Sequence, residues 1–126
     1  SSKVKFQIDA DSPEIMAQIN KPLFEWVMEN IVKNGVDAMS GIGNIKVTIG
    51  QVVEKEVFID ISDDGKGIAK GAAKDVFKPG FTTKKRGWGL GLALVKRIIE
   101  NYHEGRISVK SSQADVGTVF RIILKV

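Results

Sequence analysis

The strongest constraint on the fold is a glycine-rich stretch that leads directly into an amphipathic helix. Residues 77–102 read FKPGFTTKKRGWGLGLALVKRIIENY. Apolar residues recur near the helical period, at Leu90, Leu94, Val95, Ile98 and Tyr102. Glycines at a helix start let a ligand approach the unpaired N–H groups, and the helix dipole favours an anion there. The stretch predicts a phosphate-binding lid hinged onto a helix; the alternative is a loop that merely lets the helix pack.

Size and composition indicate one soluble globular domain, spanning residues 1–126. The chain is 43% hydrophobic and 27% charged, and no apolar run approaches the about 20 residues that cross a bilayer. Because there is no cysteine and only one histidine, disulfides, thiolate metal sites and histidine clusters are excluded. The net charge is +4, and the basic residues are scattered except for the run Lys84–Arg86. This distribution favours a phosphate ligand over nucleic acid.

Alternation and periodicity predict an α+β domain. Val4, Phe6 and Ile8 alternate with polar residues, as in a half-buried strand. Further strands are expected at 15–19, 44–51, 57–61, 107–109 and 118–126, and helices at 21–39, at 70–77 and after the glycine-rich stretch. Asn20 is the expected cap of the first helix, and Gly105 the glycine that ends the last. The fold expected is a two-layer α/β sandwich whose mixed, mostly antiparallel sheet is covered on one face by helices.

The first helix carries a polar stripe at the edge of its apolar face. Asn30, Asn34 and Asp37 are spaced i, i+4 and i+7, so they share one side. Amide and carboxylate oxygens suit a hard cation such as Mg²⁺, held largely through waters and substrate phosphates. Glu29, a quarter turn away, could reach a neighbouring water or hydroxyl. The alternative is a solvated face with a Glu29–Lys33 ion pair.

A second candidate site follows a predicted strand, in the sequence ISDDGKGI of residues 61–68. Asp63 at the strand end could accept a hydrogen bond from an exocyclic amine such as that of adenine. Gly65 and Gly67 would let a flat ring approach the backbone. The alternative is an ordinary Asp-Gly turn.

Other polar and aromatic residues have simpler interpretations. Thr118, after Gly117, could hydrogen-bond beside a base, but a β-branched strand residue needs no such role. His103 is expected to be a surface residue at a helix C-terminus. Trp26 and Trp88 are expected to be packing or lid residues.

In this order and at this spacing, the segments resemble the ATP-binding catalytic domain of sensor histidine kinases. That domain is one of the Bergerat-fold ATPases, together with type II topoisomerases, mismatch-repair ATPases and a heat-shock chaperone. The resemblance covers nearly the whole chain. Residues 29–38 resemble the family's asparagine box, residues 63–68 its first glycine box, residues 77–84 its phenylalanine-containing box, residues 87–92 its second glycine box, and Gly117-Thr118 its last glycine motif.

The resemblance implies a role for each matching residue. Asn34 would bind Mg²⁺, with Asn30 close to the metal and the phosphates. Glu29 would serve as general base or orient the acceptor, and Lys33 would lie near phosphate. Asp63 would bind the adenine amino group, with Thr118 supporting it through water. The remaining ATP contacts implied are Asp37, Gly65, Gly67, Ile68, Phe81, Thr82, Thr83, Lys84, Gly87, Gly89, Leu90, Gly91 and Leu92.

Several positions depart from the family's pattern. Gly35 stands where alanine is usual, so looser packing near the metal site is expected. Asp64 replaces an asparagine and adds negative charge beside the base pocket. Gly80 replaces an aromatic residue, and the lid between Lys84 and Gly87 is short. No phosphoacceptor helix with a His-Glu pair is present.

The resemblance implies a function, with ATP and Mg²⁺ as cofactors. The domain would supply the γ-phosphoryl group for transfer to a histidine on a separate dimerisation domain of the same parent protein, with a response regulator receiver domain downstream. The alternatives are a non-catalytic nucleotide-sensing module and an ATP-gated module of the topoisomerase or chaperone type. We expect a cytoplasmic domain without a nucleic-acid partner or a membrane segment. The parent protein could be anchored in a membrane.

Overall fold

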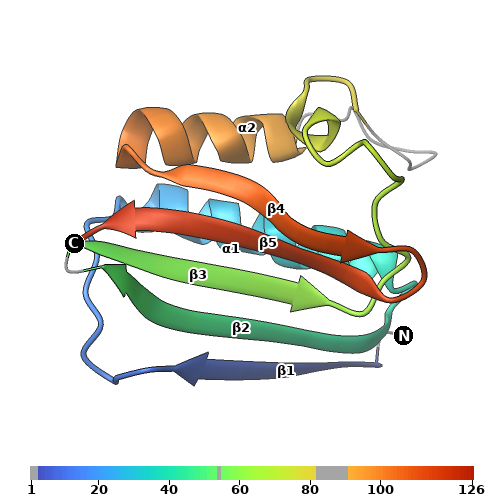
Figure 1. Ribbon diagram of the computed structural model, residues 1–126, viewed down its shortest axis with the longest axis horizontal. Coiled ribbons are helices and arrows are strands. Elements are labelled where there is room, and N and C mark those ends of the chain that lie inside the picture. Colours follow the sequence, from blue (N-terminus) through green and yellow to red (C-terminus); the bar gives the residue numbers. More distant parts are fainter. Residues whose placement is uncertain (1–2, 54, 82–90) are drawn as a thin grey trace.

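The chain folds into one mixed five-stranded sheet with its helices on one face (Figure 1). The computed structural model describes residues 3–53, 55–81 and 91–126. In chain order the elements are β1 (Lys3–Ala10), α1 (Lys21–Ala38), β2 (Ile42–Val53), β3 (Glu56–Asp63), the 3₁₀ turn η1 (Asp75–Phe77), α2 (Gly91–Arg97), the π-helical turn η2 (Ile98–Tyr102), β4 (Arg106–Gln113) and β5 (Gly117–Lys125).

The sheet is antiparallel except at one edge. The strand order is β1-β2-β3-β5-β4, with β1 parallel to β2 and each of the other neighbours antiparallel. β2 and β3 form the hairpin expected from the sequence. The fold class predicted from the sequence, an α+β sandwich with a mixed, mostly antiparallel sheet, is therefore confirmed.

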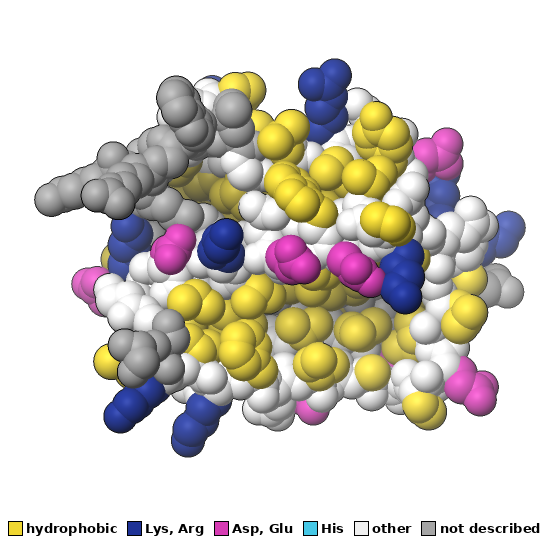
Figure 2. Space-filling model, turned by 180° about the vertical axis from the view of Figure 1, so that it is seen from behind, with side chains coloured by type: hydrophobic (Ala, Val, Ile, Leu, Met, Phe, Trp, Pro, Cys, Tyr) yellow, Lys and Arg dark blue, Asp and Glu magenta, His cyan; other side chains and the backbone are white. Residues whose placement is uncertain are grey.

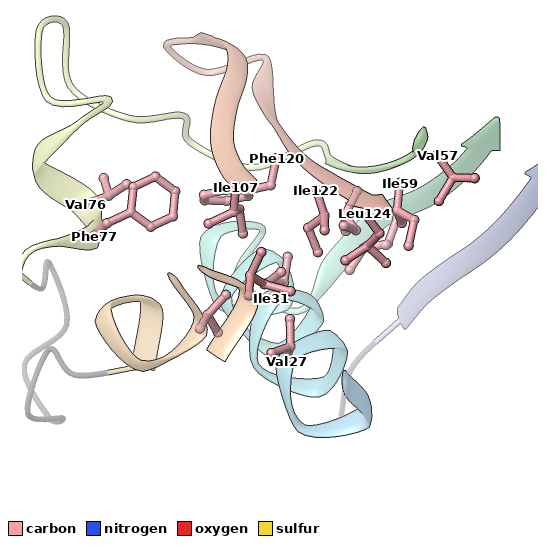
Figure 3. Close-up of a cluster of buried hydrophobic side chains, with 14 of the residues drawn as sticks. Val27, Ile31, Val57, Ile59, Val76, Phe77, Ile107, Phe120, Ile122 and Leu124 are labelled. Atoms are coloured by element: carbon pink, nitrogen blue, oxygen red, sulfur yellow. The ribbon is translucent and has the colours of Figure 1, made fainter. Parts of the chain in front are cut away.

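The core lies between the sheet and the helices (Figure 3). Every second side chain along β3 and β5 points inward, toward the helices. Val27 and Ile31 of α1 pack against the apolar members of this set. Asn20 caps α1 as predicted, because its side-chain oxygen accepts a hydrogen bond from Leu23 N at 3.1 Å. The apolar contacts hold α1 against the inner face of the sheet.

Two expected elements differ in the structure. Residues 15–19 are not a strand; they form an irregular segment that is tied to the end of β5 through Gln18, whose N donates to Lys125 O and whose Nε2 donates to Val126 O. The helix expected over 70–77 is reduced to η1, because Gly71 takes a positive φ of 84° that a helix does not accommodate.

The last helix buries a face that matches the expected one only in part. Val95 and Ile99 are fully buried, whereas Leu94 and Tyr102 are exposed. The buried stripe continues to His103, so a polar residue completes the four-residue spacing. The apolar periodicity read from the sequence was therefore right at Val95 and at Ile98, which packs against the core, and wrong at Leu94 and Tyr102.

His103 is buried rather than a surface residue, and it joins the two helices. Its side chain is 7% exposed. Nε2 accepts a hydrogen bond from Asn20 N at 3.0 Å, and Nδ1 donates to Ile98 O at 3.1 Å. The ring also meets Phe24 edge-on. Since Asn20 caps α1, this imidazole fixes the end of the second helix against the start of the first.

Gly105 is not the left-handed cap residue that the sequence suggested. Glu104 has the positive φ, at 52°, while Gly105 lies where a Cβ would overlap the carbonyl oxygen of Ile123. Glycine is needed there because the chain passes close to β5.

The outer face of the sheet carries a charged cluster. Arg121 donates to both carboxylate oxygens of Asp60, at 2.7 and 2.8 Å, and Lys110 donates at 3.1 Å. Burial alone would raise the pKa of Asp60, but these hydrogen bonds hold it below the ordinary value.

Within the described residues, no helix has the length and apolar content needed to cross a membrane.

Candidate functional site

Asp63 is the buried acid around which the site is built. It ends β3 on the inward face, opposite Ile45 and Thr118 in the neighbouring strands, and it is 7% exposed. Its Oδ1 accepts a hydrogen bond from Gly65 N at 2.8 Å. Burial raises the pKa of Asp63, although backbone N–H groups of Gly65 and Thr118 oppose the shift. A buried carboxylate at a strand end is a fixed hydrogen-bond acceptor.

The turn that follows Asp63 is tied to three other segments. Lys66 N donates to Ala38 O at the end of α1, and Asp115 N donates to Lys66 O from the β4–β5 turn. Ile68 N donates to Ser112 Oγ at 2.8 Å. The turn is therefore hydrogen-bonded to α1, to β4 and to the β4–β5 turn, and these bonds keep Asp63 beside the end of α1.

Three glycines at this corner stand where a side chain would collide with the backbone. A Cβ on Gly65 would lie 2.6 Å from Ala38 Cβ, and one on Gly67 would lie 2.6 Å from Gln113 O. A Cβ on Gly117 would overlap the carbonyl oxygen of Asp63. The predicted glycine motifs thus let three segments converge behind the acid.

Thr118 is buried beside Asp63, at 5% exposure, and its hydroxyl has a partner that the sequence did not indicate. Thr118 Oγ1 lies 2.9 Å from Ser112 Oγ. Ser112 also holds Ile68, so one serine links the threonine to the glycine turn. Ser112 can play this role because it is paired with Thr118 across β4 and β5, and no local motif reveals that pairing.

Asp64 does not stand free beside the acid. Its Oδ2 accepts hydrogen bonds from Asn44 N at 2.9 Å and from Asn44 Nδ2 at 2.8 Å. The charge of Asp64 still raises the pKa of Asp63, but it is the smallest of the causes. The carboxylate in place of the family's asparagine therefore anchors the turn to β2.

Gly35 tightens the packing that it was expected to loosen. A Cβ on Gly35 would lie 3.1 Å from Asp63 Cβ and 3.3 Å from Ile45 Cδ1. Such distances are closer than side chains normally approach, so glycine lets α1 lie directly against the strand that carries the acid.

The asparagines of α1 lie between its buried face and solvent. Asn30 and Asn34 are half-buried, whereas Asp37 is exposed. Asn30 Nδ2 donates to Trp26 O at 2.8 Å, which leaves Oδ1 as the outward atom. Asn30 Oδ1 lies 3.7 Å from where a Cβ of Gly91 would stand, at the start of α2. An acceptor oxygen therefore faces the segment predicted to hold phosphates.

Of the three residues predicted to take part in catalysis, Glu29 and Lys33 are exposed and Asn30 is half-buried. Glu29 and Lys33 belong to a row of charged side chains spaced by four residues along α1, from Lys21 through Glu25 to Asp37. The row is visible across the middle of Figure 2. Their catalytic roles stay predictions.

Part of the predicted nucleotide site lies outside the described residues. This holds for Thr82, Thr83, Lys84, Gly87, Gly89 and Leu90, and for the lid between Lys84 and Gly87. Ile68, Phe81 and Leu92 are half-buried and pack against the core, and Gly91 is exposed. Gly80 has a φ of 87°, and no atom of the described residues lies within 4 Å of where its Cβ would stand. The described residues therefore form no packing site for the aromatic side chain that is usual at this position.

The donor set fits Mg²⁺ held by an amide and by substrate phosphates. Nowhere among residues 3–53, 55–81 and 91–126 do three histidine, aspartate or glutamate side chains gather as a metal site. Mg²⁺ commonly takes one or two protein ligands and completes its shell with waters and phosphate oxygens. Asn34, half-buried on the same side as Asn30, is compatible with that kind of coordination.

The raised pKa of Asp63 predicts a pH-dependent stability difference for Asp63→Asn. Because the pKa of Asp63 is raised in the folded state, the protonated acid adds to the free energy of unfolding at pH values below 3.8, its ordinary pKa. This contribution is lost as the pH rises through the folded-state pKa. Asparagine cannot ionise, so the variant should gain stability relative to the parent between about pH 3 and pH 7. Urea unfolding at both pH values would measure this. Asp115→Asn, in an exposed turn, is the control; a relative loss with rising pH would contradict the prediction.

Comparison with known protein families gives a consistent result. Residues 20–126 match the family described as histidine kinase-, DNA gyrase B- and HSP90-like ATPase. The chain is 40% identical to sporulation kinase E of Bacillus subtilis (strain 168), over 99% of this chain and 17% of that protein. It is 38% identical to the signal transduction histidine-protein kinase AtoS of Escherichia coli (strain K12), over 99% of this chain and 20% of that protein. It thus spans about a fifth of these relatives.

Solved structures share the fold. The catalytic domain of histidine kinase ThkA superposes with a TM-score of 0.84 at 28% identity, over 97% of this chain and 78% of that one. Full-length ShkA in complex with AMPPNP gives a TM-score of 0.84 at 22% identity, over 96% of this chain and 25% of that one, which is a likeness of fold.

Proposed function

Because the chain belongs to the family of histidine kinase-, DNA gyrase B- and HSP90-like ATPases, we propose that it binds ATP with Mg²⁺ and supplies the γ-phosphoryl group for transfer to a histidine. That histidine would lie on the dimerisation domain of the chain's own parent sensor kinase. The observation that carries the proposal is the arrangement of Asp63, Asn34 and Asn30. α1 connects the buried acceptor beside its C-terminal end to Asn30, whose Oδ1 faces the start of α2, with the half-buried Asn34 one turn further along.

The base would be recognised at Asp63. The carboxylate accepts from backbone N–H groups of Gly65 and Thr118, and its remaining lone pairs would accept from the adenine amino group. Thr118 stands opposite in the ladder and could bridge to the base through water. Guanine presents a carbonyl oxygen at the same place, so two acceptors would face each other.

The phosphates would lie between α1 and the start of α2. Asn34 would hold Mg²⁺ there, and a bound Mg²⁺ would neutralise charge on the β- and γ-phosphates. Asn30 is oriented by its bond to Trp26 O, and its oxygen lies toward Gly91 at the start of α2, where the phosphates would lie. The predicted phosphate contacts of Thr83 and Lys84 lie outside the described residues.

The acceptor histidine would arrive from solvent. Glu29 is exposed one residue before Asn30, so it is placed to meet a group brought up by another domain. We propose that Glu29 orients this imidazole or takes its proton. Catalysis in such a site comes mainly from positioning and charge neutralisation.

Downstream partners and location follow the same proposal. The structure of ThkA in complex with the response regulator TrrA superposes on this chain at 25% identity with a TM-score of 0.80. We propose that a response regulator receiver domain takes the phosphoryl group from the parent kinase, and that the domain works in the cytoplasm.

Two measurements test the proposed function. Calorimetric titration with ATP, with and without Mg²⁺, should show binding that the metal strengthens. Incubation with γ-labelled ATP and the dimerisation domain of the parent protein should label a histidine on that domain. Binding without labelling would leave a nucleotide sensor, and the absence of binding in both conditions would overturn the proposal.

Asn34→Ala should remove the Mg²⁺-dependent part of ATP binding. The expected loss is about tenfold in the presence of Mg²⁺, with little change for adenosine, because only the metal ligand is deleted. Asn101→Ala, an exposed asparagine in η2, is the matched control and should bind as the parent does. If the response to Mg²⁺ survives in Asn34→Ala, the metal is held elsewhere.

A further inference from the structure

Strand β1 is the end strand of the sheet, and among the described residues it pairs with β2 alone (Figure 1). Lys3 N donates to Gly41 O, and Asp11 N donates to Ile49 O, with an unbroken parallel register in between. In a parallel ladder alternate residues bond to the same neighbour. The odd-numbered residues therefore face β2, and the backbone groups of Val4, Phe6, Ile8 and Ala10 point out of the edge.

The same four residues place apolar side chains on the helix-covered face. Val4 packs against the core, and Phe6 and Ile8 pair with Ile45 and Val47 of β2. Yet Phe6 is 62% and Ile8 is 70% exposed, because α1 does not extend over this edge. Figure 2 shows apolar side chains gathered below the charged row of α1. In monomeric proteins an edge strand is usually protected from pairing with another chain by charged side chains, prolines, bulges or a covering segment.

We propose that β1 pairs antiparallel with β1 of a second copy of this chain, about a two-fold axis at Gln7. This register places Phe6 opposite Ile8 and Val4 opposite Ala10. Those are the hydrogen-bonded positions, so every outward backbone group of the strand finds a partner. The two sheets would then join into one, with the helices of both copies on the same face.

Charge complementarity selects this register. On the opposite face Lys5 stands directly across from Asp9 of the second copy, twice by symmetry, in the closely spaced pairs. A slip that centres the axis on Phe6 places Lys3 opposite Asp9 but Lys5 opposite Gln7, whereas the register at Gln7 gives both lysines an acid, because Lys3 then stands opposite Asp11. Asp9 already attracts Lys46, at 3.3 Å, and is exposed enough to receive a second cation.

The first test is the mass of the protein in solution. Sedimentation of the parent chain should move from one to two copies between about 10 µM and about 1 mM, as expected of a small interface. Lys5→Glu and Asp9→Lys each create like-charge pairs and should weaken dimerisation about tenfold. An equimolar mixture of the two variants restores both ion pairs and should dimerise better than either alone.

The second test reads the register directly. The chain has no cysteine, so Gln7→Cys introduces its sole thiol. Across the axis the two Cα atoms would be about 4.5 Å apart, within the range that a disulfide spans. Mild oxidation should cross-link Gln7→Cys, and a mixture of Lys5→Cys with Asp9→Cys, but neither of the last two alone.

Val116→Cys is the control, because Val116 is also exposed but lies in the β4–β5 turn. Its cross-linking should stay at the level of random collision. Thermal melts of each variant establish that the fold is intact. A parent chain that stays monomeric at about 1 mM, or a dimer in which position 116 cross-links as well as position 7, would overturn the proposal. In the first case the edge is left for a strand of another protein.

Discussion

Asp63→Asn is expected to weaken ATP binding about 30-fold or more while the fold stays intact. The asparagine oxygen can still accept from Gly65 N, so its amide nitrogen must turn toward the adenine amino group. Two donors would then face each other in a buried site, and an unpaired buried donor costs about 2 kcal/mol or more. Calorimetry on the parent and the variant would measure the loss.

The control for this prediction is a second acid and a second nucleotide. Asp115→Asn keeps the same change of charge in an exposed turn and should bind ATP as the parent does. GTP should compete poorly with ATP in the parent. A loss of less than about threefold in Asp63→Asn, or equal competition by GTP, would mean that Asp63 is only a turn residue.

Gly117→Ala is expected to cost about 3 kcal/mol or more of unfolding free energy. Gly117 has a φ of 143°, and its Cβ would overlap the carbonyl oxygen of Asp63. Relief requires β5 to move away from the end of β3, which separates Thr118 from Asp63. The variant should therefore also lose ATP affinity. Denaturant unfolding and calorimetry would measure the two effects.

Gly71→Ala is the matched control for that substitution. Gly71 also has a positive φ, at 84°, but no atom of the described residues lies within 4 Å of where its Cβ would stand. It should cost only about 1 kcal/mol, the backbone term alone. The difference between the two variants then isolates the steric contact. Equal costs would show that the approach to Asp63 is not tight.

The sequence predicted the elements whose signals are local. Asn20 and Pro22 mark the start of α1, and strict alternation marks β3 and β5. Asp63 could be singled out because two glycines follow it within a short turn. Local signals do not reveal that β1 pairs in parallel with β2, because strand direction depends on the path between strands rather than on side-chain pattern.

The residues that sequence reasoning misjudged are those set by tertiary contacts. His103 lies in a buried stripe, but a single polar residue does not announce the backbone N–H that it will meet. Ser112 is in reach of Ile68 and Thr118 only because β4 pairs with β5 in one register. Gly35 looked like a helix defect, and its reason is the approach to Asp63.

The bonds around the turn after Asp63 also determine where the chain can change length. Ala38, Ser112 and Asp115 hold residues 66–68 from three directions, so one added residue there would put at least two bonds out of step. Residues 69–74 are mostly exposed, and the space around Gly71 is open. We therefore expect insertions, epitope loops or fluorescent reporters to be tolerated beside Gly71, where the chain can grow outward without disturbing the acid or the helix that faces it.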